Sequence, residues 1–158
     1  MERPLIDPSL EYALRRVEES IADACIRAGR DRDDVSLLAV TKTVDADRIN
    51  QAIALGIKQI GENRVQEFLG KKDALHLTDV QAHLIGHLQT NKVRQIVGQV
   101  DMIQSVDSER LAQAISRVSV ERGIVTPILV EVNIGGMVII PRTLMPGKSW
   151  IFSSSPSS

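Results

Sequence analysis

Residues 37–43 of the chain read LLAVTKT, an apolar run that ends on a lysine. Together with Val35, this run lacks the alternation of a half-exposed strand. It is typical of a strand that is buried on both faces, in a parallel sheet covered by helices. Lys42 then stands at the carboxyl end of that strand. Ligands bind at this end of the strands in parallel α/β folds, so Lys42 is the first candidate for a functional side chain.

The composition is that of an ordinary globular domain. The 158 residues are 43% hydrophobic and 25% charged, which suits one domain with its own core. Nineteen basic and twenty acidic residues give a formal net charge of -1. No overall electrostatic field therefore favours nucleic acid or an anionic membrane, and we expect neither partner. An anionic ligand has to be held by local groups.

Cys25 is the single cysteine, which excludes an intramolecular disulfide and a cysteine-rich metal site. The N-terminal segment MERPLIDPSLEYALRRVEES carries charges throughout and lacks the apolar segment of a signal peptide. No run approaches the ~18 apolar residues of a membrane span. These features predict a cytoplasmic protein in a reducing compartment.

Short apolar runs recur along the chain, and their starts are spaced by about twenty to twenty-five residues. The predicted strands are residues 35–40, 59–61, 82–88, 102–106 and 128–134. Helical spacing of apolar residues predicts a long first helix over 10–28 and shorter helices around 49–53, 65–69, 93–97 and 111–118. Because strand and helix alternate and crossovers are right-handed, the strands are expected to form a parallel sheet.

Five alternating strands fit two architectures, an open doubly wound sheet or the first part of a β/α barrel. A dinucleotide-binding fold requires G-x-G-x-x-G directly after its first strand, and here that turn reads TKTVDAD. The sequence therefore argues against a Rossmann site. After Gly136 the character of the chain changes, because prolines interrupt the apolar runs and the end is rich in serine and proline. Residues 137–158 are predicted to be a foreign or disordered extension.

Polar residues follow every predicted strand. In a parallel α/β fold the loops after the strands share one face, so these side chains are expected to be neighbours in space. They are Lys42, Thr43, Gly61, Glu62, Asn63, Gly86, His87, Gln89, Asn91, Ser105, Asp107, Asn133, Gly135 and Gly136.

Lys42 has two interpretations. A lysine amine adds to aldehydes, and the Schiff base with pyridoxal phosphate is the commonest use of that reactivity. The simpler interpretation is a surface lysine whose aliphatic stem lies along the end of the sheet. Asn63 and Asn133 also have two interpretations, since each could hydrogen-bond a ligand or cap the following helix.

His83 and His87 are four residues apart, a spacing that on a helix would suit a metal pair. On the predicted strand they lie on one face, about 13 Å apart at ~3.3 Å per residue. Two side chains at that separation cannot share a metal, and we predict no metal site. His87 lies at the end of the strand and remains a candidate for a second group beside a ligand.

Five motifs, in order, resemble the pyridoxal-phosphate homeostasis proteins, which are single-domain relatives of the N-terminal barrel of alanine racemase. The motifs are LLAVTKT at 37–43, GENRVQE at 61–67, HLIGHLQTNK at 83–92, QSVDSERLA at 104–112 and ILVEVNIGG at 128–136. The resemblance implies an α/β fold, a parallel TIM-like β/α barrel of the alanine racemase N-terminal type, here incomplete with about five strands. A partial cofactor-binding barrel domain then occupies residues 1–136, and a non-family tail occupies 137–158.

The resemblance also implies a cofactor. Pyridoxal 5'-phosphate (PLP) would bind as a Schiff base to Lys42, and Asn63, His87, Ser105 and Asn133 match positions that line the cofactor cavity. The family resembles a PLP binder and carrier rather than a catalyst, and PLP-dependent apo-enzymes are its expected partners. The alternative is an alanine-racemase-like enzyme with the same lysine. Racemisation needs a second acid or base, usually a tyrosine, and the only tyrosine, Tyr12, falls in the first predicted helix.

The chain departs from the family after Gly136, where relatives continue with further β/α units. A barrel's usual phosphate site is built by the loops after strands seven and eight. A chain that stops after the fifth strand is therefore expected to bind PLP weakly or not at all, and a remnant without a ligand is a third interpretation. An unclosed barrel also leaves its first and fifth strands as unpaired edges, which favours oligomers or aggregation.

Overall fold

The structure is a computed structural model that describes residues 6–133 and 139–143. A long first helix precedes a series of alternating strands and helices. The helices are α1 (Pro8–Ala28), α2 (Ala46–Ala54), α3 (Val65–Lys71), α4 (Val93–Ile96) and α5 (Glu109–Arg122), with short 3-10 turns at η1 (Arg32–Asp34), η2 (Lys72–Ala74) and η3 (Thr90–Lys92). The strands are β1 (Leu38–Val40), β2 (Gln59–Glu62), β3 (Gln81–Leu84), β4 (Met102–Val106), β5 (Ile128–Asn133) and β6 (Ile139–Thr143).

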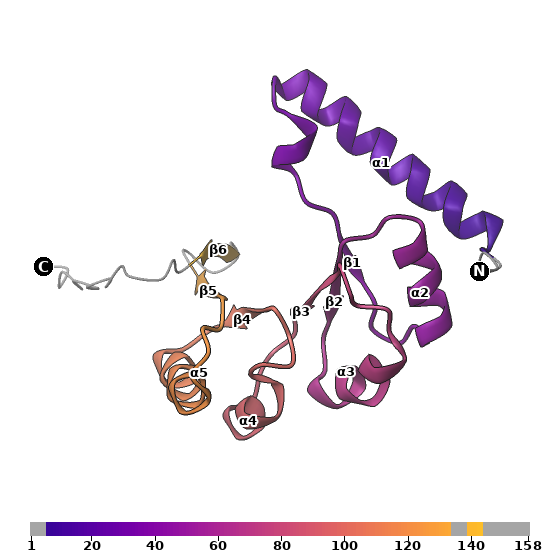
Figure 1. Ribbon diagram of the computed structural model, residues 1–158. Coiled ribbons are helices and arrows are strands. Elements are labelled where there is room, and N and C mark those ends of the chain that lie inside the picture. Colours follow the sequence, from indigo (N-terminus) through magenta and orange to yellow (C-terminus); the bar gives the residue numbers. More distant parts are fainter. Residues whose placement is uncertain (1–5, 134–138, 144–158) are drawn as a thin grey trace, which may run out of the picture.

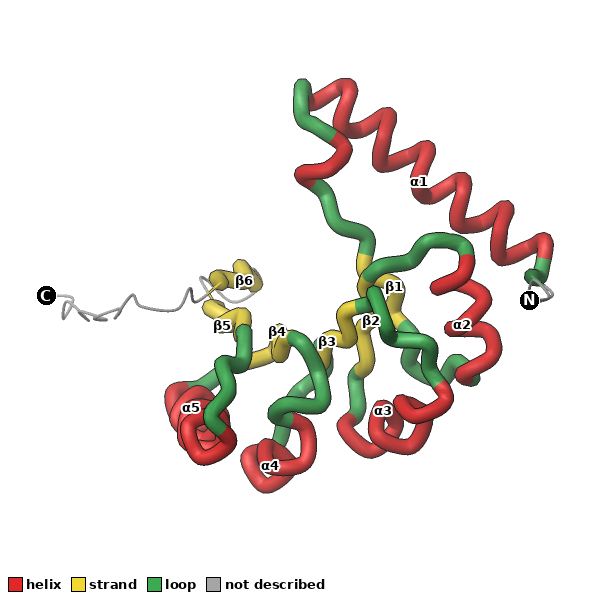
Figure 2. The backbone as a smooth tube through the Cα atoms, in the orientation of Figure 1, coloured by secondary structure: helices red, strands yellow, loops and turns green. Residues whose placement is uncertain are grey.

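The strands form one sheet in the order β1-β2-β3-β4-β5-β6. β1 to β5 pair in parallel, and β6 pairs antiparallel to β5. The sheet is curved, and α2 to α5 cover its convex side (Figures 1 and 2). The predicted fold class, an incomplete parallel β/α barrel with five parallel strands, is confirmed.

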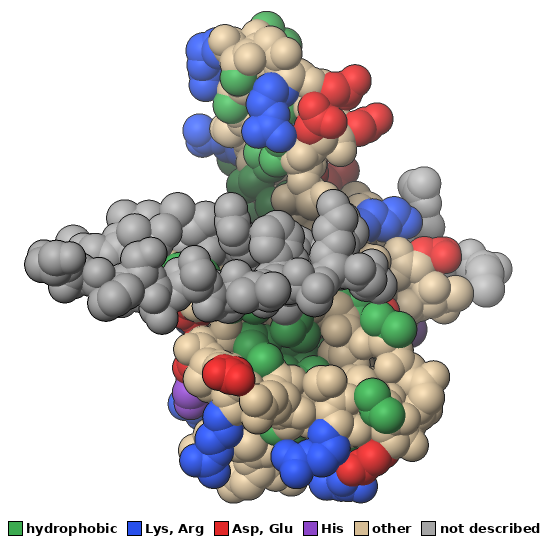
Figure 3. Space-filling model, turned by 90° about the vertical axis from the view of Figure 1, so that its left-hand side faces the viewer, with side chains coloured by type: hydrophobic (Ala, Val, Ile, Leu, Met, Phe, Trp, Pro, Cys, Tyr) green, Lys and Arg blue, Asp and Glu red, His purple; other side chains and the backbone are tan. Residues whose placement is uncertain are grey.

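The core lies between the convex side of the sheet and the helices. Alternate residues of the strands face the helices, and Ile60, Leu84 and Ile103 are at most 1% exposed there. They belong to one cluster with Phe68 of α3 and Ile96 of α4. The convex face therefore supplies the main hydrophobic stabilisation of the sheet. On the outside, charged side chains of both signs are scattered over the side of the molecule shown in Figure 3.

Helix α1 lies apart from the other helices, beyond the β1 end of the sheet (Figure 1). It begins at Pro8, where Asp7 caps the first turn by accepting a hydrogen bond from the Ser9 N–H, and Gly29, with φ 62, is its C-cap. Asp7 also joins α1 to α2, since its Oδ2 lies 2.8 Å from Arg48 Nη1. Within the described residues, none of the helices combines the length and hydropathy needed to cross a bilayer.

Residues 139–143 form β6, although the sequence predicted a foreign or disordered extension there; the remainder of 137–158 lies outside the described residues. β6 pairs with β5 from Leu129↔Thr143 to Asn133↔Ile139, so the prediction of the fifth strand as an unpaired edge was wrong. The open hydrogen-bonding groups of β5 favour a further strand, and Ile139 and Ile140 have high β-propensity. Pro141 is tolerated because it stands on an edge strand.

His87 does not lie on a strand, which corrects the predicted arrangement of the two histidines. β3 ends at Leu84, and the N–H of Ile85 makes one more bond to the carbonyl of Glu62 before the chain turns at Gly86. His83 therefore lies in the sheet and His87 lies in the following loop. The predicted strand was too long because the apolar run continues through residues that form this loop.

Candidate functional site

The carboxyl ends of the five parallel strands meet at one edge of the sheet, as predicted. Lys42 is the second residue after β1, Asn63 directly follows β2, and His87 lies in the loop after β3. Ser105 lies within β4, and Asn133 is the last residue of β5, with a side chain outside the described part of the structure. The five predicted site residues therefore share one end of the sheet.

Lys42 lies on a tight turn and is exposed. The Thr41 N–H donates to the Gly61 carbonyl at 2.9 Å and continues the pairing of β1 with β2. The Val44 N–H donates to the Thr41 carbonyl at 3.1 Å, which makes Lys42 and Thr43 the central residues of a four-residue turn. Thr43 has φ 61, a left-handed conformation that costs an L-residue about 1–2 kcal/mol.

A buried charge lies directly beneath this turn. Glu62 is 1% exposed, and its Oε1 accepts a hydrogen bond from Thr41 Oγ1 at 2.5 Å. The same oxygen lies 2.6 Å from Lys71 Nζ, whose side chain is 13% exposed. Among the described residues, the other carboxylate oxygen, Oε2, has no hydrogen-bond partner. The ion pair is therefore held in a low-dielectric place where a lone charge would be costly.

Lys71 also binds the backbone on both sides of Lys42. Its Nζ donates to the carbonyls of Thr41, at 2.9 Å, and of Val44, at 3.1 Å. Glu67, one helical turn earlier on α3, lies 3.3 Å from the same ammonium and accepts a hydrogen bond from the Thr43 N–H. The bond from Thr43 and the ammonium of Lys71 lower the pKa of the Glu67 carboxyl. The turn is thus tied to β2 through the Thr41 N–H and to α3 through the Thr41 and Val44 carbonyls and the Thr43 N–H.

The ends of β2, β3 and β4 meet at Gly86. A Cβ at this position would lie 2.3 Å from the carbonyl oxygen of Asn63, so only glycine allows the two loops to approach this closely. Ser105 is buried, and its hydroxyl donates to the Gly86 carbonyl. Because that donor is used within the protein, Ser105 can offer only its acceptor oxygen to a ligand.

His87 forms a hydrogen bond with Asp107 at the same end of the sheet, with 3.1 Å between Nδ1 and Oδ2. The histidine side chain is 70% exposed, and this pairing leaves Nε2 for another partner. Asp107 does not cap the next helix, because Ser108 is the N-cap of α5. Asp107 instead orients an imidazole.

His83 lies within the sheet and is 5% exposed. Its Nδ1 is 2.7 Å from Nε2 of Gln104 on β4. Burial lowers the pKa of His83, and the nearby charge of Asp101 only partly opposes this effect. A neutral imidazole that accepts the amide hydrogen of Gln104 satisfies both observations.

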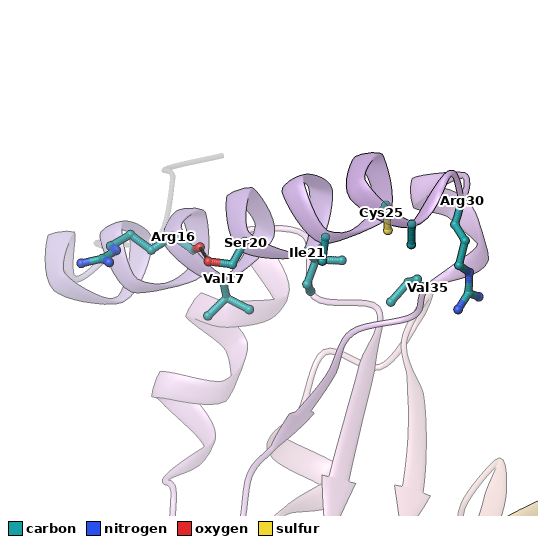
Figure 4. Close-up of a pocket in the computed structure, with 9 residues that line it drawn as sticks. Arg16, Val17, Ser20, Ile21, Cys25, Arg30 and Val35 are labelled. Carbon is teal, nitrogen blue, oxygen red and sulfur yellow. Dashed lines mark hydrogen bonds between the residues drawn. The ribbon is translucent and has the colours of Figure 1, made fainter.

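A hollow of about 610 Å³ lies elsewhere, under α1. Figure 4 shows Val17, Ile21 and Cys25 pointing from α1 toward the side of the helix where Val35 lies. None of the five predicted site residues lines it. The hollow is therefore separate from the edge that carries Lys42.

Sequence reasoning missed the group under the turn. Glu62 is one of many polar residues that follow the predicted strands, and Thr41, Glu67 and Lys71 are not among the predicted site residues. One signal was present, because Glu67 and Lys71 are spaced i,i+4 and Glu62 follows the buried pair Ile60 and Gly61. The partnership itself joins residues that are far apart in the chain.

The fold and the residues at the carboxyl ends of its strands together define a class of protein: a parallel β/α half-barrel with an exposed lysine at the carboxyl end of its first strand. The comparisons with known proteins place the chain within it. No family model matches. The chain is 46% identical over 123 residues to the pyridoxal phosphate homeostasis protein of Aquifex aeolicus, a match that covers 78% of this chain and 54% of that protein.

Two solved structures agree with this match. An unknown protein from Bifidobacterium adolescentis has a TM-score of 0.73 at 39% identity, covering 80% of this chain and 57% of that one. PipY of Synechococcus elongatus PCC7942 with PLP bound has a TM-score of 0.61 at 38% identity, covering 72% and 54%. The predicted resemblance is confirmed: the chain is a relative of the pyridoxal phosphate homeostasis proteins and spans about half the length of the curated relatives it matches.

Proposed function

We propose that this chain binds PLP in the service of PLP homeostasis and that Lys42 is the covalent anchor. The observation that carries the proposal is the place of Lys42, an exposed amine on a tight turn at the carboxyl end of β1. The similarity to pyridoxal phosphate homeostasis proteins, and to a PipY structure with PLP bound, supports the choice of ligand.

The residues present fit this cofactor chemically. PLP would supply a reactive aldehyde, and the Lys42 amine would be the group that holds it covalently, with water as the leaving group. Asn63 and the His87 imidazole, held by Asp107, offer donors and acceptors at the same edge. Ser105 and Asn133 complete the set of residues that we assign to the cofactor site.

The proposed role is that of a binder and carrier of PLP. Apo-enzymes that depend on PLP are the acceptors in this proposal, and the cytoplasm is its compartment. The single cysteine, Cys25, is a free and buried thiol, which fits a reducing environment.

The proposal is tested with the full chain and PLP. We expect a visible absorbance band from the Schiff base and, after reduction with borohydride and digestion, a pyridoxyl group on Lys42. Lys42→Ala should lose both signals. Lys58→Ala is the matched control, because Lys58 is an exposed lysine just before β2, at the opposite end of a strand, and it should keep both.

Titration of the band with PLP measures the affinity. A label spread evenly over several lysines, or a band that survives in Lys42→Ala, would show that Lys42 is not the anchor. Absence of any adduct in the unmutated chain would reject covalent binding of PLP by this chain.

A further inference from the structure

We propose that Lys71 is the positioning residue of Lys42: its ammonium clamps the two backbone carbonyls that flank the anchoring lysine and holds the turn in its strained form. The positioning role rests on the proposed function of Lys42 as the anchor of PLP. The contacts of Lys71 with the turn are a property of the fold and do not depend on that function. Lys71 does not have to touch the ligand to play this role.

The geometry of the clamp encloses the turn. Lys71 Nζ reaches the carbonyl before Lys42, that of Thr41, at 2.9 Å, and the carbonyl after Thr43, that of Val44, at 3.1 Å. Glu67 takes the N–H of Thr43 between them. Lys71 and Glu67 of α3 therefore fix the start, the middle and the end of the turn that follows β1.

The turn requires such a clamp because its own sequence does not favour it. A turn with a left-handed third residue usually places glycine there, whereas this chain has Thr43 with φ 61. The branched side chain of threonine makes that conformation more unfavourable. Without outside contacts the turn would relax toward other conformations, and the direction of the Lys42 side chain would change with it.

Glu62 fixes the clamp in turn. It is 1% exposed, and its Oε1 lies 2.6 Å from Lys71 Nζ, so the ammonium cannot leave without stranding a buried carboxylate. Thr41 Oγ1, on the residue after β1, donates to the same oxygen and so joins the turn to the last residue of β2. The position of the lysine head is therefore set by the core of the fold rather than by solvent.

Lys71→Met tests the clamp, because methionine keeps the length of the side chain and removes the charge. Hydrogen exchange of the Thr43 and Val44 amides is followed by NMR in the full chain without PLP. We expect about tenfold faster exchange at these two amides, because the turn opens more readily once the bonds from the charged Lys71 to the Thr41 and Val44 carbonyls are lost. The amide of Ile103, which is bonded to the Pro127 carbonyl in the core, should not change.

Lys72→Met is the matched control. Lys72 is the next residue, and its ammonium binds Asp73 and Gln99 rather than the turn. Exchange at Thr43 and Val44 should be unaffected in this variant. If Lys71→Met alone does not fold, the double variant Glu62→Gln/Lys71→Met removes the stranded charge and is measured in its place.

The second measurement is the initial rate at which borohydride traps PLP on Lys42. We expect that rate to fall about tenfold in Lys71→Met, in step with the loosened turn, and to stay unchanged in Lys72→Met. Exchange at Thr43 and Val44 that equals the unmutated rate, or that rises only together with Ile103, overturns the clamp whatever the trapping shows. Faster exchange in Lys71→Met with an unchanged trapping rate overturns the positioning role. If the unmutated chain traps no PLP, the proposed function is overturned, and the exchange measurement alone decides whether the clamp exists.

Discussion

Thr43 is the residue at which local preference and native conformation disagree. Its φ of 61 is imposed by the surrounding contacts, since threonine by itself avoids this region. Backbone strain of this kind concentrates near functional residues, and here it adjoins the exposed Lys42. The energy that holds Thr43 comes from Glu67, Lys71 and Glu62, which are placed by α3 and β2.

His83 makes the stability of the fold depend on pH. Burial lowers its pKa below the ordinary 6.5, so the unfolded chain binds a proton at a pH where the folded chain does not. Stability from this group is therefore complete above pH 6.5 and is lost as the pH falls from 6.5 through the folded-state pKa. Urea unfolding of the unmutated chain at several pH values should show this decrease.

The variant His83→Gln should flatten that decrease, because glutamine does not titrate and can still accept from Gln104. His76→Gln is the control. His76 is exposed, and its hydrogen bond to the Asn50 side chain comes from the His76 backbone N–H, which the substitution keeps. It should leave the pH dependence as it is. An unchanged slope in His83→Gln would assign the effect to other groups.

At the scale of elements, Gly86 decides how closely the loops after β2 and β3 can approach. Gly86→Ala would place a Cβ 2.3 Å from the Asn63 carbonyl oxygen and 2.7 Å from its Cα. Since both are backbone atoms, the loops have to move, and we expect a loss of about 1–3 kcal/mol in the free energy of unfolding. Urea denaturation measures it.

Gly70→Ala is the contrasting substitution. Gly70 lies inside α3, and a Cβ there meets nothing within 4 Å. Alanine should stabilise the helix by roughly 0.5–1 kcal/mol, because glycine loses more backbone freedom on folding. Equal destabilisation by both substitutions would show that the contact with Asn63 is not what makes Gly86 necessary.

The parallel β/α elements could be predicted because their signal is local. Each of the five parallel strands overlaps a predicted strand, including the short one at 59–61 that became β2. The N-cap of α2 is a local feature of the same kind, since the Asp45 side chain accepts from the Arg48 N–H at 2.8 Å. Such features depend on neighbouring residues, which the sequence shows directly.

The parts that could not be predicted depend on partners far along the chain. β6 forms because the edge of β5 is open. In the sequence, Pro141 interrupts the apolar run and so argues against a strand there. Lys71 looks like a surface lysine on a short helix until the fold brings Glu62 and the turn of Lys42 beneath it. Periodicity describes a single element, whereas these features arise between elements.

At the scale of the molecule, the sheet is covered unevenly. α2 to α5 cover its convex side, and β6 covers the β5 edge (Figure 2). Within the described residues β1 is the opposite edge, and Val40 on it is 52% exposed. The apolar hollow under α1 lies at the same end of the sheet, beside Val35. Apolar surface and unpaired strand groups therefore coincide at one end.

This end is where we expect copies of the chain to associate. A parallel edge strand presents unpaired N–H and carbonyl groups, and an exposed valine beside them adds an apolar contact. The average mass measured by sedimentation should rise with protein concentration. Val40→Lys should keep the protein at the mass of a single chain over a wider concentration range, because a charge on an edge strand opposes edge-to-edge pairing.

Val125→Lys is the control for the added charge. Val125 is 74% exposed and lies between α5 and β5, away from the β1 edge. If the β1 edge drives association, only Val40→Lys should reduce it, because the two variants change the net charge equally. Equal reduction by both would assign the effect to net charge, and a constant mass for the unmutated chain would mean that α1 and the short length of β1 already protect this edge.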